Sequence, residues 1–197
     1  MTFPFIEEIT MHWKKIFLPL LLTACSFSAW AQTELATIPS LNVPRYMGTW
    51  YEVAKLPNPF QKNCVSNTLA IYEAMPNGTV RVTNRCTESN GKVKEAVGEA
   101  RQIGNATSPK LEVRFAPAWL SFLPFVWGNY WVIDLDADYK LAAISEPGRE
   151  LLWILSRTPQ VCDAAFKPLL DRLAKTGFDL KKMEATPHTL PRVASNC

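Results

Sequence analysis

Eight short segments with the residue pattern of β-strands follow one another between residues 47 and 156, and no segment of helical length interrupts them. In Lys110–Ala116, Leu111, Val113 and Phe115 alternate with charged residues, which predicts one buried and one solvated face. Asn-Gly and Pro-Gly pairs between segments are typical of antiparallel hairpins. The predicted strands are Met47–Leu56, Val65–Ala74, Thr79–Cys86, Lys92–Ile103, Lys110–Ala116, Asn129–Leu135, Lys140–Ser145 and Leu151–Ser156.

A single predicted helix follows these strands. Thr158-Pro159 is expected to open it, because proline suits a first helical turn. One apolar stripe then recurs at intervals of three and four residues, at Val161, Ala165, Leu169, Leu170 and Leu173. Gly177 is expected to end the helix, and Phe178–Ala185 to form a short closing strand.

The absence of crossover helices between the predicted strands argues against a parallel sheet. The pattern therefore predicts an all-β fold, either an eight-stranded antiparallel up-and-down barrel or a sandwich, with one C-terminal α-helix packed outside.

Residues 11–31 have the composition of an export signal. Two lysines precede a short apolar run, 16–24, which is shorter than the ~20 residues that a bilayer core requires. Acidic residues further upstream do not suit such a signal, so we expect translation to begin at Met11.

Two cleavage sites compete at the end of this signal. Leu22-Thr23-Ala24-Cys25 resembles the bacterial lipobox, in which the cysteine becomes a lipidated N-terminus. Ala29-Trp30-Ala31 instead predicts a soluble periplasmic protein that begins at Gln32. We favour lipidation of Cys25 and export to the outer membrane, where each buried methylene of the anchor contributes ~0.8 kcal/mol.

Composition excludes several classes of function. A net charge of +3, from 21 Lys+Arg and 18 Asp+Glu, is too small and too dispersed to indicate a nucleic-acid partner. The two histidines are His12, in the predicted signal, and His188, so a multi-histidine metal site is excluded. With no nucleophile motif and no obvious acid–base pair, we expect neither an enzyme nor a cofactor or metal.

The cysteines fit an exported chain. Apart from Cys25 there are four, Cys64, Cys86, Cys162 and Cys197, and an even number indicates disulfides. Strand spacing argues against Cys64–Cys86. With Asn77-Gly78 as a tight turn, Cys86 faces a residue five positions from Cys64, too far for a bond unless a bulge or sharp bend intervenes.

Three motifs, in order, resemble those of the lipocalin family: Gly48-Thr49-Trp50 at the first strand, Asp138-Tyr139, and Arg157 after the eighth strand. The flanking sequences Arg45–Ala54 and Leu152–Pro159 are similar to the bacterial outer-membrane lipoprotein lipocalins, an apolipoprotein D-like branch. The resemblance covers about residues 43–185.

The resemblance implies a barrel that is closed at one end and open at the other. It places Trp50 at the closed end beneath Arg157, a cation–π contact worth about 0.5–2 kcal/mol, with Gly48 allowing close chain approach. It also implies a cup for lipophilic molecules, which in the bacterial branch are fatty acids and lysophospholipids.

Residues expected to contact such a ligand are aromatic, with one amide, and each could instead be ordinary core packing. They are Tyr72, Asn84, Phe115, Trp119, Phe122, Phe125, Trp127, Tyr130, Trp131 and Trp153. The four arginines that could meet an anionic headgroup if they point inward are Arg81, Arg85, Arg101 and Arg114, although most are expected on the solvated face.

The uncharged segment Ala116–Trp127 is unusual, because loops of this kind are normally polar. It could cover the cup, enter a membrane interface, form a homodimer contact, or pack on the protein's own surface.

The resemblance also bears on the disulfides. Relatives that carry cysteines at both matching positions favour Cys64–Cys86, which leaves Cys162–Cys197. The main alternative joins Cys64 or Cys86 to Cys197.

The expected organisation is a signal peptide (1–24), a tether (25–42), the barrel and helix (43–185) and a tail (186–197). The expected function is that of a cell-envelope protein that binds a fatty acid or lysophospholipid, attached to the membrane through an N-terminal lipid anchor. The alternatives are an interaction protein that docks a membrane or partner through residues 116–127 and, less favoured, a lipid-modifying enzyme.

Overall fold

The computed structural model describes residues 34–189. Its strands are β1 (Gly48–Lys55), β2 (Cys64–Ala74), β3 (Val80–Glu88), β4 (Val93–Gln102), β5 (Lys110–Arg114), β6 (Gly128–Leu135), β7 (Leu141–Ser145), β8 (Leu152–Ser156) and β9 (Glu184–Ala185). Its α-helices are α1 (Val43–Tyr46) and α2 (Asp163–Lys175), and its 3-10 helices are η1 (Pro59–Gln61), η2 (Ala118–Leu120), η3 (Pro124–Val126) and η4 (Leu180–Lys182). The expected signal segment, Cys25 and Cys197 lie outside the described residues.

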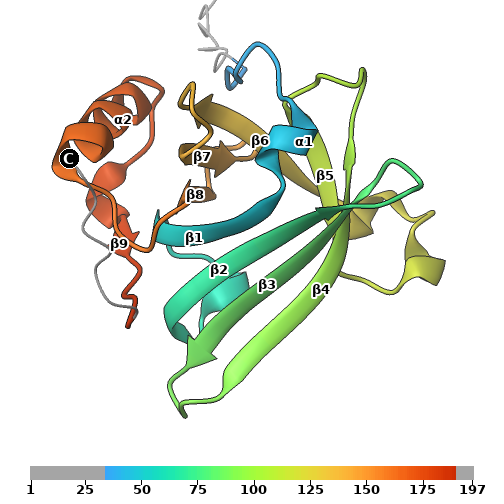
Figure 1. The fold of residues 1–197 in the computed structure, drawn as a ribbon, viewed down its shortest axis with the longest axis horizontal. Coiled ribbons are helices and arrows are strands. Elements are labelled where there is room, and N and C mark those ends of the chain that lie inside the picture. The colour runs from blue at the N-terminus through green and yellow to red at the C-terminus, as the bar shows by residue number, and fades with distance from the viewer. Residues whose placement is uncertain (1–33, 190–197) are drawn as a thin grey trace, which may run out of the picture. The chain divides into compact units, whose positions relative to one another are not determined.

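The strands form one antiparallel sheet that closes into a barrel (Figure 1). Strands β2 to β8 are neighbours in chain order, and β1 completes the circle by pairing with β8 on one side and β2 on the other. At the closure, Trp50 pairs with Ala70, and Tyr51 pairs with both Leu69 and Ser156. The predicted eight-stranded barrel is confirmed, and β9 is an additional strand.

The C-terminal segment fills the seam where β1 and β2 separate, after the pair Tyr51–Leu69. β9 pairs with the end of β1, and the backbone N–H of Asn67 in β2 donates to the carbonyl of Pro187 over 2.8 Å. The predicted closing strand, Phe178–Ala185, was too long: η4 occupies its middle and β9 has two residues. The segment nevertheless satisfies backbone groups that an open seam would leave unpaired.

The turn between β2 and β3 is longer than the predicted two-residue turn. Met75 donates its N–H to the carbonyl of Thr79, so Pro76-Asn77-Gly78 is a three-residue loop. Gly78 has φ of +81°, a left-handed conformation that glycine adopts without a steric cost.

Cys64 and Cys86 form a disulfide with a Cα–Cα distance of 5.6 Å. Two register shifts in β2 bring them together, one between Cys64 and Ser66 and one between Ser66 and Leu69. The bulge that the spacing argument required is therefore present, and Asn67 within it has φ of +54°. Cys162 is also disulfide-bonded.

Helix α2 packs on the outer face of the barrel, at the left of Figure 1. Its buried residues Leu169 and Leu173 form a second core with Ala143 of β7 and Ile154 of β8. The helix begins at Asp163 and not at Thr158-Pro159, as predicted, while Gly177 follows its last turn as expected, with φ of +92°. No helix within residues 34–189 is long and apolar enough to cross a membrane.

Removal of the Cys64–Cys86 bond should lower the free energy of unfolding. We expect Cys64→Ser/Cys86→Ser to lose about 2–4 kcal/mol, because the unfolded chain regains the freedom of the loop between these cysteines. Urea unfolding under oxidising conditions measures the loss. An unchanged midpoint and slope would contradict a stabilising role for this disulfide.

Candidate functional site

The barrel interior is lined by a core that is aromatic at its closed end. It contains the buried side chains of Tyr46, Trp50 and Tyr72, and Tyr130 and Trp153 pack against the same core. These residues come from α1, β1, β2, β6 and β8, so five separate elements meet around the same space.

Arg157 and Trp50 close one end of the barrel. The Trp50 ring is fully buried, and the guanidinium carbon of Arg157 lies 4.0 Å from its centroid. Arg157 also donates to the carbonyls of Thr49, Arg45 and Tyr139, at 2.9, 3.0 and 3.2 Å. A Cβ at Gly48, where φ is +95°, would lie 3.3 Å from Arg157 Nη1, so glycine leaves room for this crossing.

Three tyrosine hydroxyls meet inside the barrel. The hydroxyl of Tyr130 lies 2.9 Å from that of Tyr46 and 2.9 Å from that of Tyr72. Burial raises the pKa of Tyr72 to about 12 and raises the pKa values of Tyr46 and Tyr130 well above their ordinary value. All three hydroxyls are therefore neutral near pH 7, and two contacts use only two of their three hydrogens. One donor is left for a polar atom of a ligand or water.

The wall formed by β2, β3 and β4 carries small side chains. Asn84 of β3 pairs in register with Ala70 of β2 and Ala96 of β4, and Val82 pairs with Gly98. Because Ala70 and Val82 belong to the interior core, Asn84, Ala96 and Gly98 share the inner face. The interior thus has a small-residue wall opposite the aromatic side chains of β6 and β8.

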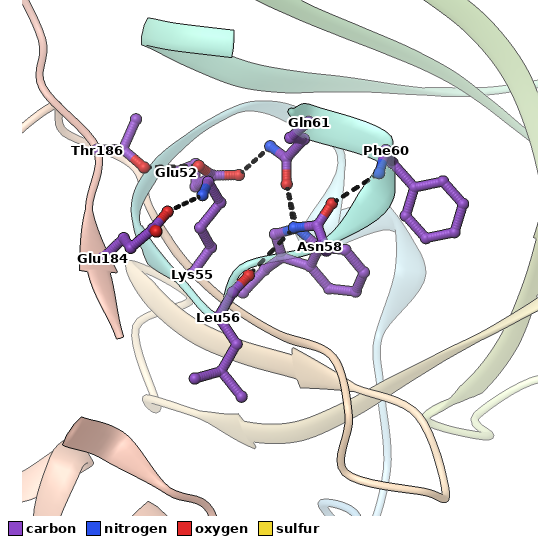
Figure 2. Close-up of polar contacts among 9 residues, drawn as sticks. Glu52, Lys55, Leu56, Asn58, Phe60, Gln61, Glu184 and Thr186 are labelled. Atoms are coloured by element: carbon purple, nitrogen blue, oxygen red, sulfur yellow. Dashed lines mark hydrogen bonds and ion pairs between the residues drawn. The ribbon is translucent and has the colours of Figure 1, made fainter. Parts of the chain in front are cut away.

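A buried carboxylate, Glu52, connects the interior to the C-terminal segment (Figure 2). Its Oε2 accepts from Gln61 Nε2 at 2.5 Å, and its Oε1 accepts from the hydroxyl of Thr186 at 2.6 Å. Gln61 Oε1 in turn accepts from the indole N–H of Trp153 at 2.7 Å. Glu52 is 2% exposed, and burial raises the pKa of its carboxyl, opposed by these hydrogen bonds.

The structure brings only some of the predicted ligand residues together. Tyr72, Tyr130 and Trp153 belong to the interior core, and Asn84 shares its face. Trp131 instead packs with the outer core beneath α2, with Lys110 Nζ 4.1 Å from its ring centroid. The side of the sheet that Trp131 faces depends on strand register, which the sequence pattern left open.

The segment 116–127 lies outside the barrel, at the right of Figure 1. The guanidinium carbons of Arg101 and Arg114 lie 4.1 and 5.1 Å from the ring centroid of Trp127, which therefore covers the outer face of β4 and β5. Three other predicted ligand residues are exposed to solvent, Trp119 at 73%, Phe122 at 75% and Phe125 at 80%. Phe115 is 43% exposed, and its ring lies where a Cβ of Gly98 would point, on the face that Gly98 shares with Ala96.

The predicted headgroup arginines all lie on the outer face. Arg85 pairs with Glu95, Arg101 with Glu112, and Arg114 with Glu99. Arg81 alternates with the inward residues Val80 and Val82 of β3.

Sequence reasoning missed two residues of the interior site. Tyr46 was visible only as a neighbour of the Gly48-Thr49-Trp50 motif, and Gln61 lies in η1, between two predicted strands. The burial of Glu52 had no local signal, because it depends on Thr186 at the far end of the chain.

A closed antiparallel barrel with an outer helix and an arginine crossing a buried tryptophan defines the class of protein. Residues 41–188 match the model of the Lipocalin-like domain. The chain is 40% identical to temperature-induced lipocalin-1 of Arabidopsis thaliana over 158 residues, 79% of this chain and 84% of that protein. It is 33% identical to the outer membrane lipoprotein Blc of Escherichia coli K12, in a match that covers 82% of this chain and 87% of that protein.

Mouse apolipoprotein D is 32% identical, covering 75% of this chain and 77% of that protein. Among solved structures, insecticyanin from the tobacco hornworm Manduca sexta matches with a TM-score of 0.58 at 20% identity, covering 78% and 84% of the two chains. The chain belongs to the lipocalin family.

The buried Glu52 predicts a dependence of stability on pH. Its pKa is raised in the folded state, so between the ordinary value of 4.5 and the raised value the folded protein holds a proton that the unfolded chain has released. This contribution to stability is complete below pH 4.5 and is lost as the pH rises through the folded pKa. Urea unfolding across this range should show a steeper fall in the wild type than in Glu52→Gln.

Glu73→Gln, at an exposed position of β2, is the matched control and should keep the wild-type slope. Equal slopes for Glu52→Gln and the wild type would show that Glu52 does not titrate in this way.

Proposed function

We propose that this protein is a lipid-binding lipocalin of the cell envelope, which holds a fatty acid or lysophospholipid non-covalently inside the barrel. The observation that carries the proposal is the asymmetric interior. Small residues of β2 and β4 line one side of the interior and aromatic side chains of β6 and β8 the other, and a neutral tyrosine hydroxyl keeps one donor. An acyl chain lying against these rings would gain roughly 25 cal/mol for each Å² of apolar surface removed from water.

The position in the cell envelope is supported by the sequence upstream of the barrel. Cys25 follows a lipobox-like motif, and the similar protein Blc is named an outer membrane lipoprotein. We propose that Cys25 carries the anchor and that the barrel lies on the periplasmic side. The lipid would then be stored, transported or returned to the membrane.

Binding, and not catalysis, suits the groups that meet the interior. The tyrosine hydroxyls have raised pKa values and do not ionise near neutral pH. Glu52 has both carboxylate oxygens engaged, by Gln61 and Thr186. These groups therefore orient a ligand more readily than they transfer a proton.

Substitution of the small-residue wall should close the proposed cup. Ala96→Phe places a ring on the inner face of β4, and overlap of about 1–3 kcal/mol should weaken fatty-acid binding by roughly tenfold or more. Native mass spectrometry followed by denaturing lipid extraction measures bound lipid in wild type and variant.

Val93→Phe adds the same ring on the outer face of the same strand, at an exposed position, and should bind lipid as the wild type does. The proposal would be contradicted by a wild-type protein that is free of lipid and remains so after incubation with fatty acids and lysophospholipids.

A second candidate function is membrane docking through residues 116–127, supported by the exposure of Trp119, Phe122 and Phe125. Indole and phenyl rings suit a bilayer interface. In a Cys25→Ser background, which removes the proposed anchor, Trp119→Ser/Phe122→Ser/Phe125→Ser should lower co-sedimentation with vesicles by about tenfold or more.

Phe60→Ser, which removes a 66%-exposed ring from η1, is the control and should sediment unchanged. Equal sedimentation of the triple variant and its parent would exclude this docking mode. A change in mass from dimer to monomer on the triple substitution would instead assign the segment to a homodimer contact.

A further inference from the structure

A pocket of about 530 Å³ lies at the outer wall of the barrel, beside the chain that leaves β5. Three segments form it: the β2–β3 turn, with Met75 and Thr79; the outer face of β3 and β4, with Arg81 and Val97; and the chain that leaves β5, with Phe115. Its volume is within the range of small-molecule sites in proteins.

Arg114 in the pocket wall holds a hydrogen-bond donor that no described residue accepts. The side chain is almost fully buried, and its Nη2 donates to Glu99 Oε2 at 2.8 Å while Nη1 donates to the carbonyl of Ala116. Its Nε is buried and has no acceptor within residues 34–189. A buried charged donor without an acceptor is costly, and such a group marks a place where an oxygen is missing.

Arg81 supplies a second cation at the same pocket. Its guanidinium makes no ion pair or hydrogen bond with any described residue, whereas Arg85 on the same face of β3 pairs with Glu95. The acidic residue in the wall is Glu99, which already binds Arg114. On its other side Arg81 has Glu73 of β2 as its register partner, so the charges around the pocket nearly balance. What favours an anion is the set of guanidinium N–H groups that no described residue accepts.

The rest of the wall is largely apolar. Met75, Val97, Phe115 and Pro117 border the two arginines, so a bound anion would have hydrophobic surface beside it. We propose that this outer pocket binds the anionic head of an amphiphile, a phosphate or carboxylate between Arg81 and Arg114, with the first part of its apolar chain against Val97 and Phe115.

The two arginines and Val97 of this site lie on the opposite side of the sheet from the proposed cup, and Gly98 borders both. Alternation along β4 puts Val97 and Glu99 on the outer face and Ala96 and Ala100 on the inner face. The head could belong to a free amphiphile or to a lipid in a bilayer, and both present the same chemistry to the arginines.

The test uses the purified protein, with octyl phosphate as the soluble probe. Methyl signals of Met75 and Val97 in NMR spectra report the pocket directly, because both side chains line it. Octyl phosphate should shift them saturably, and inorganic phosphate or octanol alone should bind at least about tenfold more weakly, since each offers one half of the ligand. Vesicles of phosphatidylcholine, with and without phosphatidylglycerol, form the second arm.

Charge variants sharpen the result. Arg81→Ala should raise the dissociation constant for octyl phosphate about tenfold, while Arg85→Ala, the matched control on the same face, should leave it unchanged. At the exposed Val97, Val97→Glu should weaken binding and Val97→Lys should strengthen it, each by a few-fold.

Shifts with octyl phosphate assign the site to a free amphiphile, and shifts only with phosphatidylglycerol vesicles assign it to a bilayer lipid. The absence of shifts in both arms would overturn the proposal. Binding that Ala96→Phe abolishes and Arg81→Ala leaves intact would also overturn it, because the probe would then occupy the cup. Failure of the cup in the Ala96→Phe experiment leaves the outer pocket's predictions unchanged.

Discussion

The structure depends on β1, because the barrel closes on this one strand. β1 has eight residues, but it pairs with β2 only over Gly48–Tyr51, while Tyr51–Lys55 pairs with β8. Along the rest of β1, the backbone groups on the side of β2 would lack strand partners. The C-terminal segment satisfies them: β9 pairs there, and His188 Nε2 donates to the carbonyl of Glu52 at 2.7 Å. Barrel closure therefore joins the two ends of the domain.

The same closure explains how polar groups come to be buried. Glu52 lies where β1 and β2 separate. Its carboxylate accepts hydrogen bonds from Gln61, which precedes β2, and from Thr186, which follows β9. At the other end, Arg157 satisfies three backbone carbonyls while its plane covers Trp50. Burial lowers the pKa of Arg157, yet a guanidinium remains charged at any physiological pH. Arg157 thus satisfies backbone carbonyls at the closed end, and Glu52 joins β1 to the C-terminal segment at the seam.

The sequence predicted the eight strands and the barrel because alternation and turn residues are local signals, and Lys110–Arg114 shows both. It did not decide the Cys64–Cys86 bond, because two bulges shift a register that simple counting assumes to be regular. It also assigned Trp127 and Trp131 to a ligand site, although both lie on outer faces. The sequence around an aromatic residue in or beside a strand does not show which face of the sheet its side chain lies on. A family motif such as Gly48-Thr49-Trp50 does imply the face.

Strand β4 shows how one stretch of sequence can serve two surfaces. Ala96, Gly98 and Ala100 are small on the inner face, where the proposed cup needs room, and Val97 and Glu99 alternate with them outside. A larger residue at Gly98 would collide with the carbonyl of Arg114, 2.5 Å from its Cβ. The Phe115 ring also lies 2.7 Å from that position, so glycine here leaves space for this ring and for the chain that leaves β5. Substitution at Gly98 should therefore disturb both surfaces, while changes at Ala96 or Val97 separate them.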